Sequence, residues 1–167
     1  TVMQGDVVHE NENNYLAAVL EKGGDFTLAY VDLTTGELKA TKLNSKAEIY
    51  SEIAGLEVKE VLFYEGESVE LRSELEKRLG TVFSYLNKNM QYMDETTFQA
   101  VTENVSDESL RPVLALLLHY LAKTQMRSLD HLQKAEEYDT SHYLVFTQEV
   151  RRNLELSTSL RDGTRNG

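Results

Sequence analysis

The chain has 167 residues, of which 41% are hydrophobic and 27% are charged, and it contains no cysteine. This hydrophobic content is enough for a packed core and too high for a disordered chain. The lack of cysteine excludes disulfides, thiolate metal sites and cysteine nucleophiles, and it agrees with a cytoplasmic location. No apolar run reaches the roughly 18 residues that a membrane span requires, so we expect no membrane partner.

Charge is unevenly distributed along the chain. The net charge is −11, and residues 1–100 hold 9 cationic against 18 acidic side chains. A nucleic-acid-binding surface needs clustered cations that displace the counterions of phosphate groups. We therefore predict that this chain makes no direct contact with DNA.

Three predicted strands open the chain. Residues 14–21 form a short apolar run, and Gly23 and Gly24 after it can supply the positive φ of a tight hairpin turn. Residues 26–32 are rich in aromatic and β-branched side chains, as strands are. After a second turn, residues 37–43 alternate charged and apolar positions, as an edge strand does. These runs predict an antiparallel meander.

Helices and strands then alternate. Ser45 and Glu48 form a capping box, which starts a helix that we expect to end at Gly55. Residues 58–64 end in four consecutive apolar or aromatic residues, which indicates a strand buried on both faces. A leucine repeat predicts a second helix over residues 67–79, and a fifth strand follows at residues 81–86.

The element order β-β-β-α-β-α-β defines the predicted fold class. Three antiparallel strands followed by two crossover helices are the ribonuclease-H-like arrangement. We therefore predict an α/β domain over residues 1–106, with a mixed five-stranded sheet and flanking helices. A mostly helical segment follows this domain.

The polar stretch that follows the fifth strand carries three apolar residues, Met90, Tyr92 and Met93. Methionine suits both the gaps of a core and the adaptable surface of a partner site, so the two interpretations stay open, with core packing as the more common role. A short helix is expected after Asp94.

The strongest helical pattern ends near residue 127. Ser106 or Ser109 could be its N-cap, and Ser109 is the better candidate, because it places Pro112 in the first turn, where a missing N–H costs little. Leucines on nearly all sides predict a helix buried between two modules. We therefore expect residues 107–167 to form a linking helix and the incomplete opening of a second domain, with a short strand at residues 143–146.

A ribonuclease-H-like arrangement raises the possibility of a metal-dependent nuclease, which needs several carboxylates around its metal ions. The first strand has no central acid, Asp32 and Glu65 lie at strand ends, and Glu48 already has a capping role. His119, inside the apolar helix, is expected to be a hydrogen-bonded core residue and not a metal ligand. No phosphate-binding motif occurs. We predict no catalytic, metal or cofactor-binding residue.

Several stretches carry a family resemblance: residues 12–18, 117–121, 124–125, 128–132 and 151–156, the last with the sequence RRNLEL. In this order and spacing they resemble bacterial MutS, a family of DNA mismatch-repair proteins. The similarity covers essentially the whole chain, and the RRNLEL run is among its most specific parts.

The resemblance implies a role. MutS proteins recognise mispaired bases, bind ATP and recruit MutL, and the motifs of their mismatch-reading and ATPase domains are absent from this sequence. The implied role is a non-catalytic connector domain plus the opening of the core domain, in contact with other domains of the same protein. ATP, Mg²⁺ and mismatched DNA would then concern only the full-length protein.

The resemblance also implies a surface for MutL, which counting back from Tyr120 places near Met90 and Gln91. The predicted docking residues are Asn89, Met90, Gln91, Tyr92 and Met93. A metal-dependent nuclease and a purely structural spacer are the alternative interpretations.

Overall fold

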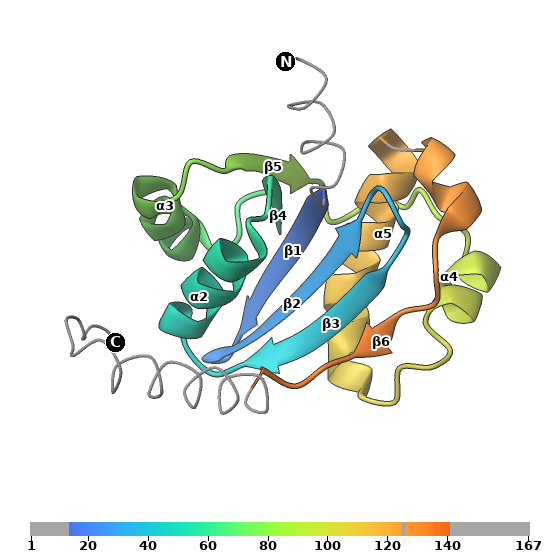
Figure 1. The fold of residues 1–167 in the computed structure, drawn as a ribbon, viewed down its shortest axis with the longest axis horizontal. Coiled ribbons are helices and arrows are strands. Elements are labelled where there is room, and N and C mark those ends of the chain that lie inside the picture. The colour runs from blue at the N-terminus through green and yellow to red at the C-terminus, as the bar shows by residue number, and fades with distance from the viewer. Residues whose placement is uncertain (1–13, 125, 141–167) are drawn as a thin grey trace, which may run out of the picture.

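The computed structural model of the chain describes residues 14–124 and 126–140 (Figure 1). The strands are β1 (Tyr15–Lys22), β2 (Asp25–Asp32), β3 (Leu38–Leu43), β4 (Glu60–Tyr64), β5 (Val82–Leu86) and β6 (Glu136–Glu137). The helices are α2 (Lys46–Leu56), α3 (Val69–Arg78), α4 (Glu95–Val101) and α5 (Arg111–Thr124), with 3-10 turns η1 (Glu108–Leu110) and η2 (Met126–His131). The predicted strand at residues 143–146 and the RRNLEL run lie outside the described residues.

The six strands form one mixed sheet in the order β5-β4-β1-β2-β3-β6. β1, β2 and β3 are antiparallel neighbours, whereas β4 runs parallel to β1 and β5 runs parallel to β4. Lys22 pairs with Asp25 across a two-residue turn, in which Gly23 and Gly24 have φ values of 59° and 88°. These left-handed values favour glycine, so the predicted hairpin and meander are confirmed.

The prediction of five strands is short by one, because β6 pairs in parallel with β3. Both residues of β6 are glutamates, which carry no strand pattern of their own. Tyr138 extends this contact, since its N–H donates to the Ala40 carbonyl over 3.0 Å and its carbonyl accepts from Thr41 Oγ1 over 2.6 Å. The sixth strand therefore exists because the returning chain lies along β3.

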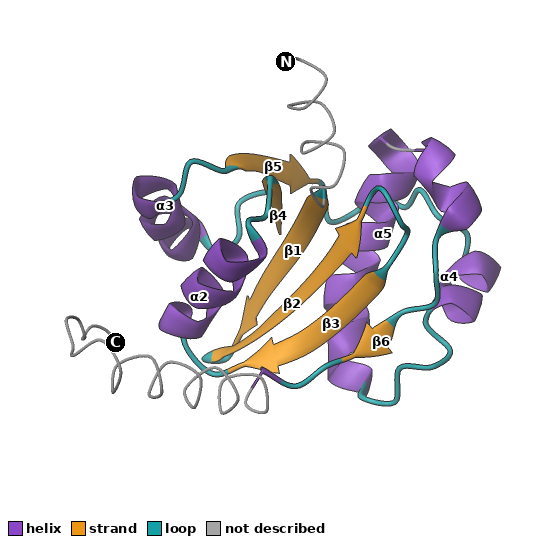
Figure 2. Cartoon of the chain, in the orientation of Figure 1, coloured by secondary structure: helices purple, strands orange, loops and turns teal. Residues whose placement is uncertain are grey.

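Helices cover both faces of the sheet, with α5 behind the strands and α2 in front of them in Figure 2. Alternate residues of β1 contribute to two separate cores, because successive strand side chains point to opposite faces. Leu16 and Ala18 lie in the core that contains α5, and Ala17 and Val19 lie in the core that contains α2 and α3. The helical residues of the second core are Ile49, Ile53, Leu71 and Leu75.

Helix α5 is buried nearly all round, as predicted. Its fully buried side chains are Val113, Leu114, Leu116, Leu117, Leu118 and Leu121, each 0% exposed. They share one core with the sheet, and each such leucine stabilises the fold by roughly 1.5–3 kcal/mol. The domain division at residue 107 stays a prediction, because residues 141–167 lie outside the described chain. No helix in the described ranges combines the length and apolar character needed to cross a bilayer.

The ends of α2 agree only in part with the prediction. Ser45 caps the helix, and its Oγ accepts from the Glu48 N–H over 3.2 Å. The Glu48 carboxylate accepts from the Asn44 N–H over 2.8 Å, one residue before the position expected for a capping box. The expected stop at Gly55 is wrong, because the helix continues to Leu56 and ends at Glu57 with a φ of 55°.

The start of α5 also differs from the prediction. Asp107, and not Ser109, is the N-cap of this region, since its Oδ1 accepts from the Ser109 N–H over 3.0 Å. This bond caps η1, which the backbone bond from the Leu110 N–H to the Asp107 carbonyl closes over 3.0 Å, and α5 follows directly with Pro112 in its first turn. A short aspartate side chain that bonds two residues ahead is typical of such turns.

Candidate partner-binding segment

The predicted docking residues lie in the segment 87–94, which joins β5 to α4. The four residues from Asn89 to Tyr92 are exposed, and the exposed fraction is 47% for Met90 and 38% for Tyr92. Met93 is only 7% exposed and packs in the core that contains α5. Core packing is therefore confirmed for Met93, whereas Met90 and Tyr92 reach the surface and their contact with a partner stays a prediction.

Asn87 forms a turn at the start of the segment. Its Oδ1 accepts from the Asn89 N–H over 2.8 Å, and its carbonyl accepts from the Met90 N–H over 3.2 Å. Lys88 donates to the Glu67 carboxylate over 2.7 Å, and this hydrogen bond raises the pKa of Lys88. The ion pair is exposed, so the turn depends on the asparagine bonds more than on this pair.

His119 of α5 holds the other end of the segment. Its Nδ1 accepts from the backbone N–H groups of Tyr92 and Met93, each over 3.0 Å. Lys123, one helical turn further on, places Nζ 5.7 Å from the centre of the Tyr92 ring, a cation–π contact. The prediction that His119 is hydrogen-bonded is confirmed, although the residue is partly buried at the rim of the core and not fully inside it.

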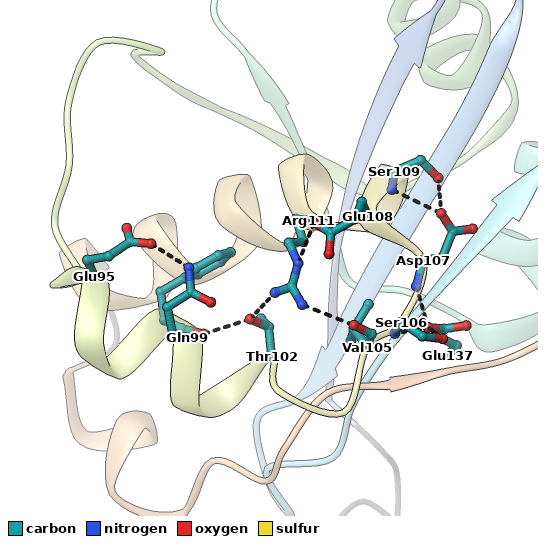
Figure 3. Close-up of polar contacts among 11 residues, drawn as sticks. Glu95, Gln99, Thr102, Val105, Ser106, Asp107, Glu108, Ser109, Arg111 and Glu137 are labelled. Atoms are coloured by element: carbon teal, nitrogen blue, oxygen red, sulfur yellow. Dashed lines mark hydrogen bonds and ion pairs between the residues drawn. The ribbon is translucent and has the colours of Figure 1, made fainter.

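A polar cluster fixes the corner between α4 and α5 (Figure 3). Arg111 donates to Thr102 Oγ1 over 2.6 Å and to the Val105 carbonyl over 3.0 Å. The Glu137 carboxylate of β6 accepts from the Asp107 N–H over 2.8 Å. These bonds hold the connection that leads from the C-terminal end of α4 to the start of α5.

Exposed apolar side chains gather in one stretch of the chain. Among residues 14–124 and 129–140, the exposed large hydrophobic side chains are Val69, Val82, Tyr85, Met90 and Tyr92. They come from α3, from the outer strand β5 and from the segment that follows β5. The exposure of Val82 and Tyr85 could not be predicted, because the residue pattern of one strand does not reveal whether that strand lies at the edge of a sheet.

The acidic residues considered for a metal site have other roles. Asp32 is 2% exposed, and its Oδ1 accepts from the Thr34 N–H over 2.9 Å in the turn after β2. Glu48 caps α2, and Glu65 is exposed after β4. In the part of the chain that the structure describes, no group of three or more histidine or acidic side chains is placed to hold a metal ion.

Two comparisons relate the sequence to known proteins. The family model for MutS domain II matches residues 14–133. The chain is 38% identical over 168 residues to the DNA mismatch repair protein MutS of Geobacillus kaustophilus, a match that covers 100% of this chain and 18% of that protein. For the proteins of the same name from Macrococcus caseolyticus and Listeria welshimeri, the identities are 35% over 167 residues and 36% over 169 residues. These matches cover 100% of this chain and 18% and 19% of the relatives, so the chain spans less than a fifth of their length.

Proposed function

The chain belongs to the MutS domain II family of DNA mismatch repair proteins, and from this premise we propose that it is a non-catalytic connector that docks MutL. In this proposal, the chain joins the mismatch-binding and ATPase regions of a longer cytoplasmic protein. Those regions, and not this chain, would contact mismatched DNA and use ATP and Mg²⁺. Residues 107–167 would lead from the connector into the next domain.

The strand order supports a ribonuclease-H-like scaffold. An antiparallel meander is followed by two crossovers that add β4 and β5 in parallel on the side of β1. The centre of β1 is apolar on both faces, since Leu16, Ala17, Ala18 and Val19 are at most 1% exposed. A nuclease of this arrangement would need metal-binding acids near such a central strand. The apolar strand and the structural roles of Asp32 and Glu48 therefore support a structural domain and not a nuclease.

The observation that carries the docking proposal is the exposure of Met90 and Tyr92 on a segment held at both ends. An asparagine turn fixes the start of the segment, and His119 and buried Met93 fix its end. A thioether adapts to the shape of a partner, and a tyrosine adds a large amphipathic surface. We assign partner contact to Asn89, Met90, Gln91 and Tyr92, and an anchoring role to Met93.

The proposal can be tested by titrating MutL against the full-length protein that carries Met90→Glu or Tyr92→Glu. We expect affinity to fall about tenfold or more, because a buried interface disfavours an unpaired charge. Ala47→Glu is the matched control, since it adds the same charge at an exposed position of α2 outside the segment. Its affinity should equal that of the parent protein.

Normal MutL recruitment by correctly folded Met90→Glu and Tyr92→Glu proteins would exclude this segment as the docking site. Equal losses in these two variants and in Ala47→Glu would show an effect of net charge and not of the segment. A parent protein that binds no MutL at all would favour the purely structural spacer.

A further inference from the structure

The imidazole of His119 meets two backbone donors with one acceptor atom. Nδ1 lies 3.0 Å from the nitrogen of Tyr92 and 3.0 Å from that of Met93. A nitrogen that accepts hydrogen bonds carries no proton, so the neutral ring must hold its proton on Nε2. If the ring were protonated, the Nδ1–H would point at two further N–H groups and both hydrogen bonds would be lost.

These two peptide N–H groups occupy the point where the chain passes from the surface into the core. Tyr92 is exposed and the next residue, Met93, is buried. A shared acceptor on α5 fixes the backbone at this step and satisfies donors that would otherwise need water. The same helix also positions the Tyr92 ring, through Lys123. The direction in which the segment presents Met90 and Tyr92 therefore depends on contacts with α5.

We propose that His119 is a positioning residue for partner docking: its neutral imidazole holds the backbone of residues 92–93, and protonation of the ring releases the segment. This inference rests on the proposed docking function of the segment. His119 itself contacts the backbone of the segment and not the partner. The consequence is a docking surface that is ordered at neutral pH and loosened in mild acid.

The surroundings of the ring favour its neutral form. Burial lowers the pKa of His119 below its ordinary value of 6.5, while the Glu95 carboxylate at the start of α4 acts in the opposite direction. Charged and titratable groups on the neighbouring elements include Lys123, which lies over the Tyr92 ring, and Asp94, whose carboxylate accepts from the Thr97 N–H in α4. Among all these groups, the Glu95 carboxylate is the one that favours protonation of the His119 ring.

The direction of the pH effect follows from this lowered pKa. At pH values between the pKa of His119 in the folded chain and its pKa in the unfolded chain, the unfolded chain binds more protons. The free energy of unfolding therefore rises with pH in that interval. The contribution of the imidazole anchor is complete above pH 6.5 and is lost as the pH falls through the lower, folded pKa. Any pH effect on the segment should therefore occur below neutrality.

Two substitutions separate the acceptor from the space that the ring fills. His119→Asn places a carbonyl oxygen close to the position of Nδ1 and does not titrate in this range. His119→Leu fills a similar volume and offers no acceptor. In amide exchange measured by NMR on the 167-residue chain, we expect the Tyr92 and Met93 amides of His119→Leu to exchange about fivefold to tenfold faster. The His119→Asn chain should keep the slow rates, and protection of the Leu117 amide reports whether each variant is folded.

The pH profile supplies a readout that a merely structural role would not change. In the parent chain, the amide shifts of Tyr92 and Met93 should titrate together with the His119 ring, and nitrogen spectra should place the proton on Nε2. In His119→Asn, the same amides should not respond between pH 7.5 and pH 5.5, the values chosen to bracket roughly the range of a histidine. Unchanged exchange in folded His119→Leu, or amide shifts independent of the ring, would overturn the inference.

The binding of MutL is measured in a separate experiment. MutL titration of full-length His119→Leu should show a several-fold loss of affinity that His119→Asn restores, with Met90→Glu measured in parallel. If Met90→Glu binds MutL normally, the docking proposal fails, whatever the exchange rates are. If Met90→Glu loses binding but His119→Leu does not, docking stands and the positioning role of His119 is refuted.

Discussion

The central strand β1 and the stretch 82–93 are both rich in apolar residues, yet they bury them very differently. Leu16 to Val19 of β1 are at most 1% exposed, because strands flank β1 on both sides and helices cover both faces of the sheet. Val82 is 62% exposed and Met90 is 47% exposed. In the described chain, β5 has one neighbouring strand, and the segment after it has none. The exposure of an apolar side chain is thus set by the elements around it and not by its residue type.

The substitution with the largest expected effect on stability is Leu16→Ala in β1. We expect it to lower the free energy of unfolding by about 3 kcal/mol, because it leaves a cavity where relaxation is limited on both sides. Val82→Ala, which truncates an exposed side chain of the edge strand, should cost less than about 1 kcal/mol. Urea unfolding of the two variants measures both values. Equal losses would show that β1 and β5 do not differ as their burial suggests.

A sharper test compares two methionines within one segment. Met93→Ala should cost about 2 kcal/mol, near the lower end for buried methionine, because its side chain lies at the rim of the core. Met90→Ala should change stability by no more than about 0.5 kcal/mol, because its side chain reaches solvent. Thermal unfolding of both variants decides the point. A marked loss in Met90→Ala would mean that this residue packs against the fold.

The smallest expected effect concerns helix ends, where a hydrogen bond and not burial makes the difference. Ser45→Ala removes the acceptor for the Glu48 N–H and should cost about 1 kcal/mol. Ser68 also stands at an N-cap position, but its side chain makes no capping bond, so Ser68→Ala should leave stability almost unchanged. Urea midpoints of the two variants provide the measurement. A similar loss in both would point to the helix propensity of the position and not to the cap.

Much of the fold could be predicted from local signals. The Gly23–Gly24 turn, the Ser45 cap and the leucine spacing of α3 act between residues a few positions apart, and each produced the expected element. The same signals failed at Gly55, because a glycine need not end a helix when the following residues can continue it. They also failed at Ser109, since its N–H and its hydroxyl both donate to Asp107, which caps the turn in its place.

The candidate site was predictable only as a stretch of sequence. The apolar residues in polar surroundings drew attention to Met90, Tyr92 and Met93, but nothing local distinguishes the buried methionine from the exposed one. His119 was expected to be hydrogen-bonded, and its partners lie 26 and 27 positions away along the chain. No spacing rule connects residues at that distance.

The sequence by itself determined five of the six described strands, the main helices and the family that the chain resembles. Only the tertiary structure decided that β5 lies at the edge of the described sheet, that two glutamates pair with β3, and that His119 contacts segment 87–94. The physical reason is the separation along the chain of the residues that interact. Caps, turns and periodic burial depend on near neighbours, whereas edge position, burial and hydrogen-bond partners depend on which distant elements the folded chain brings together.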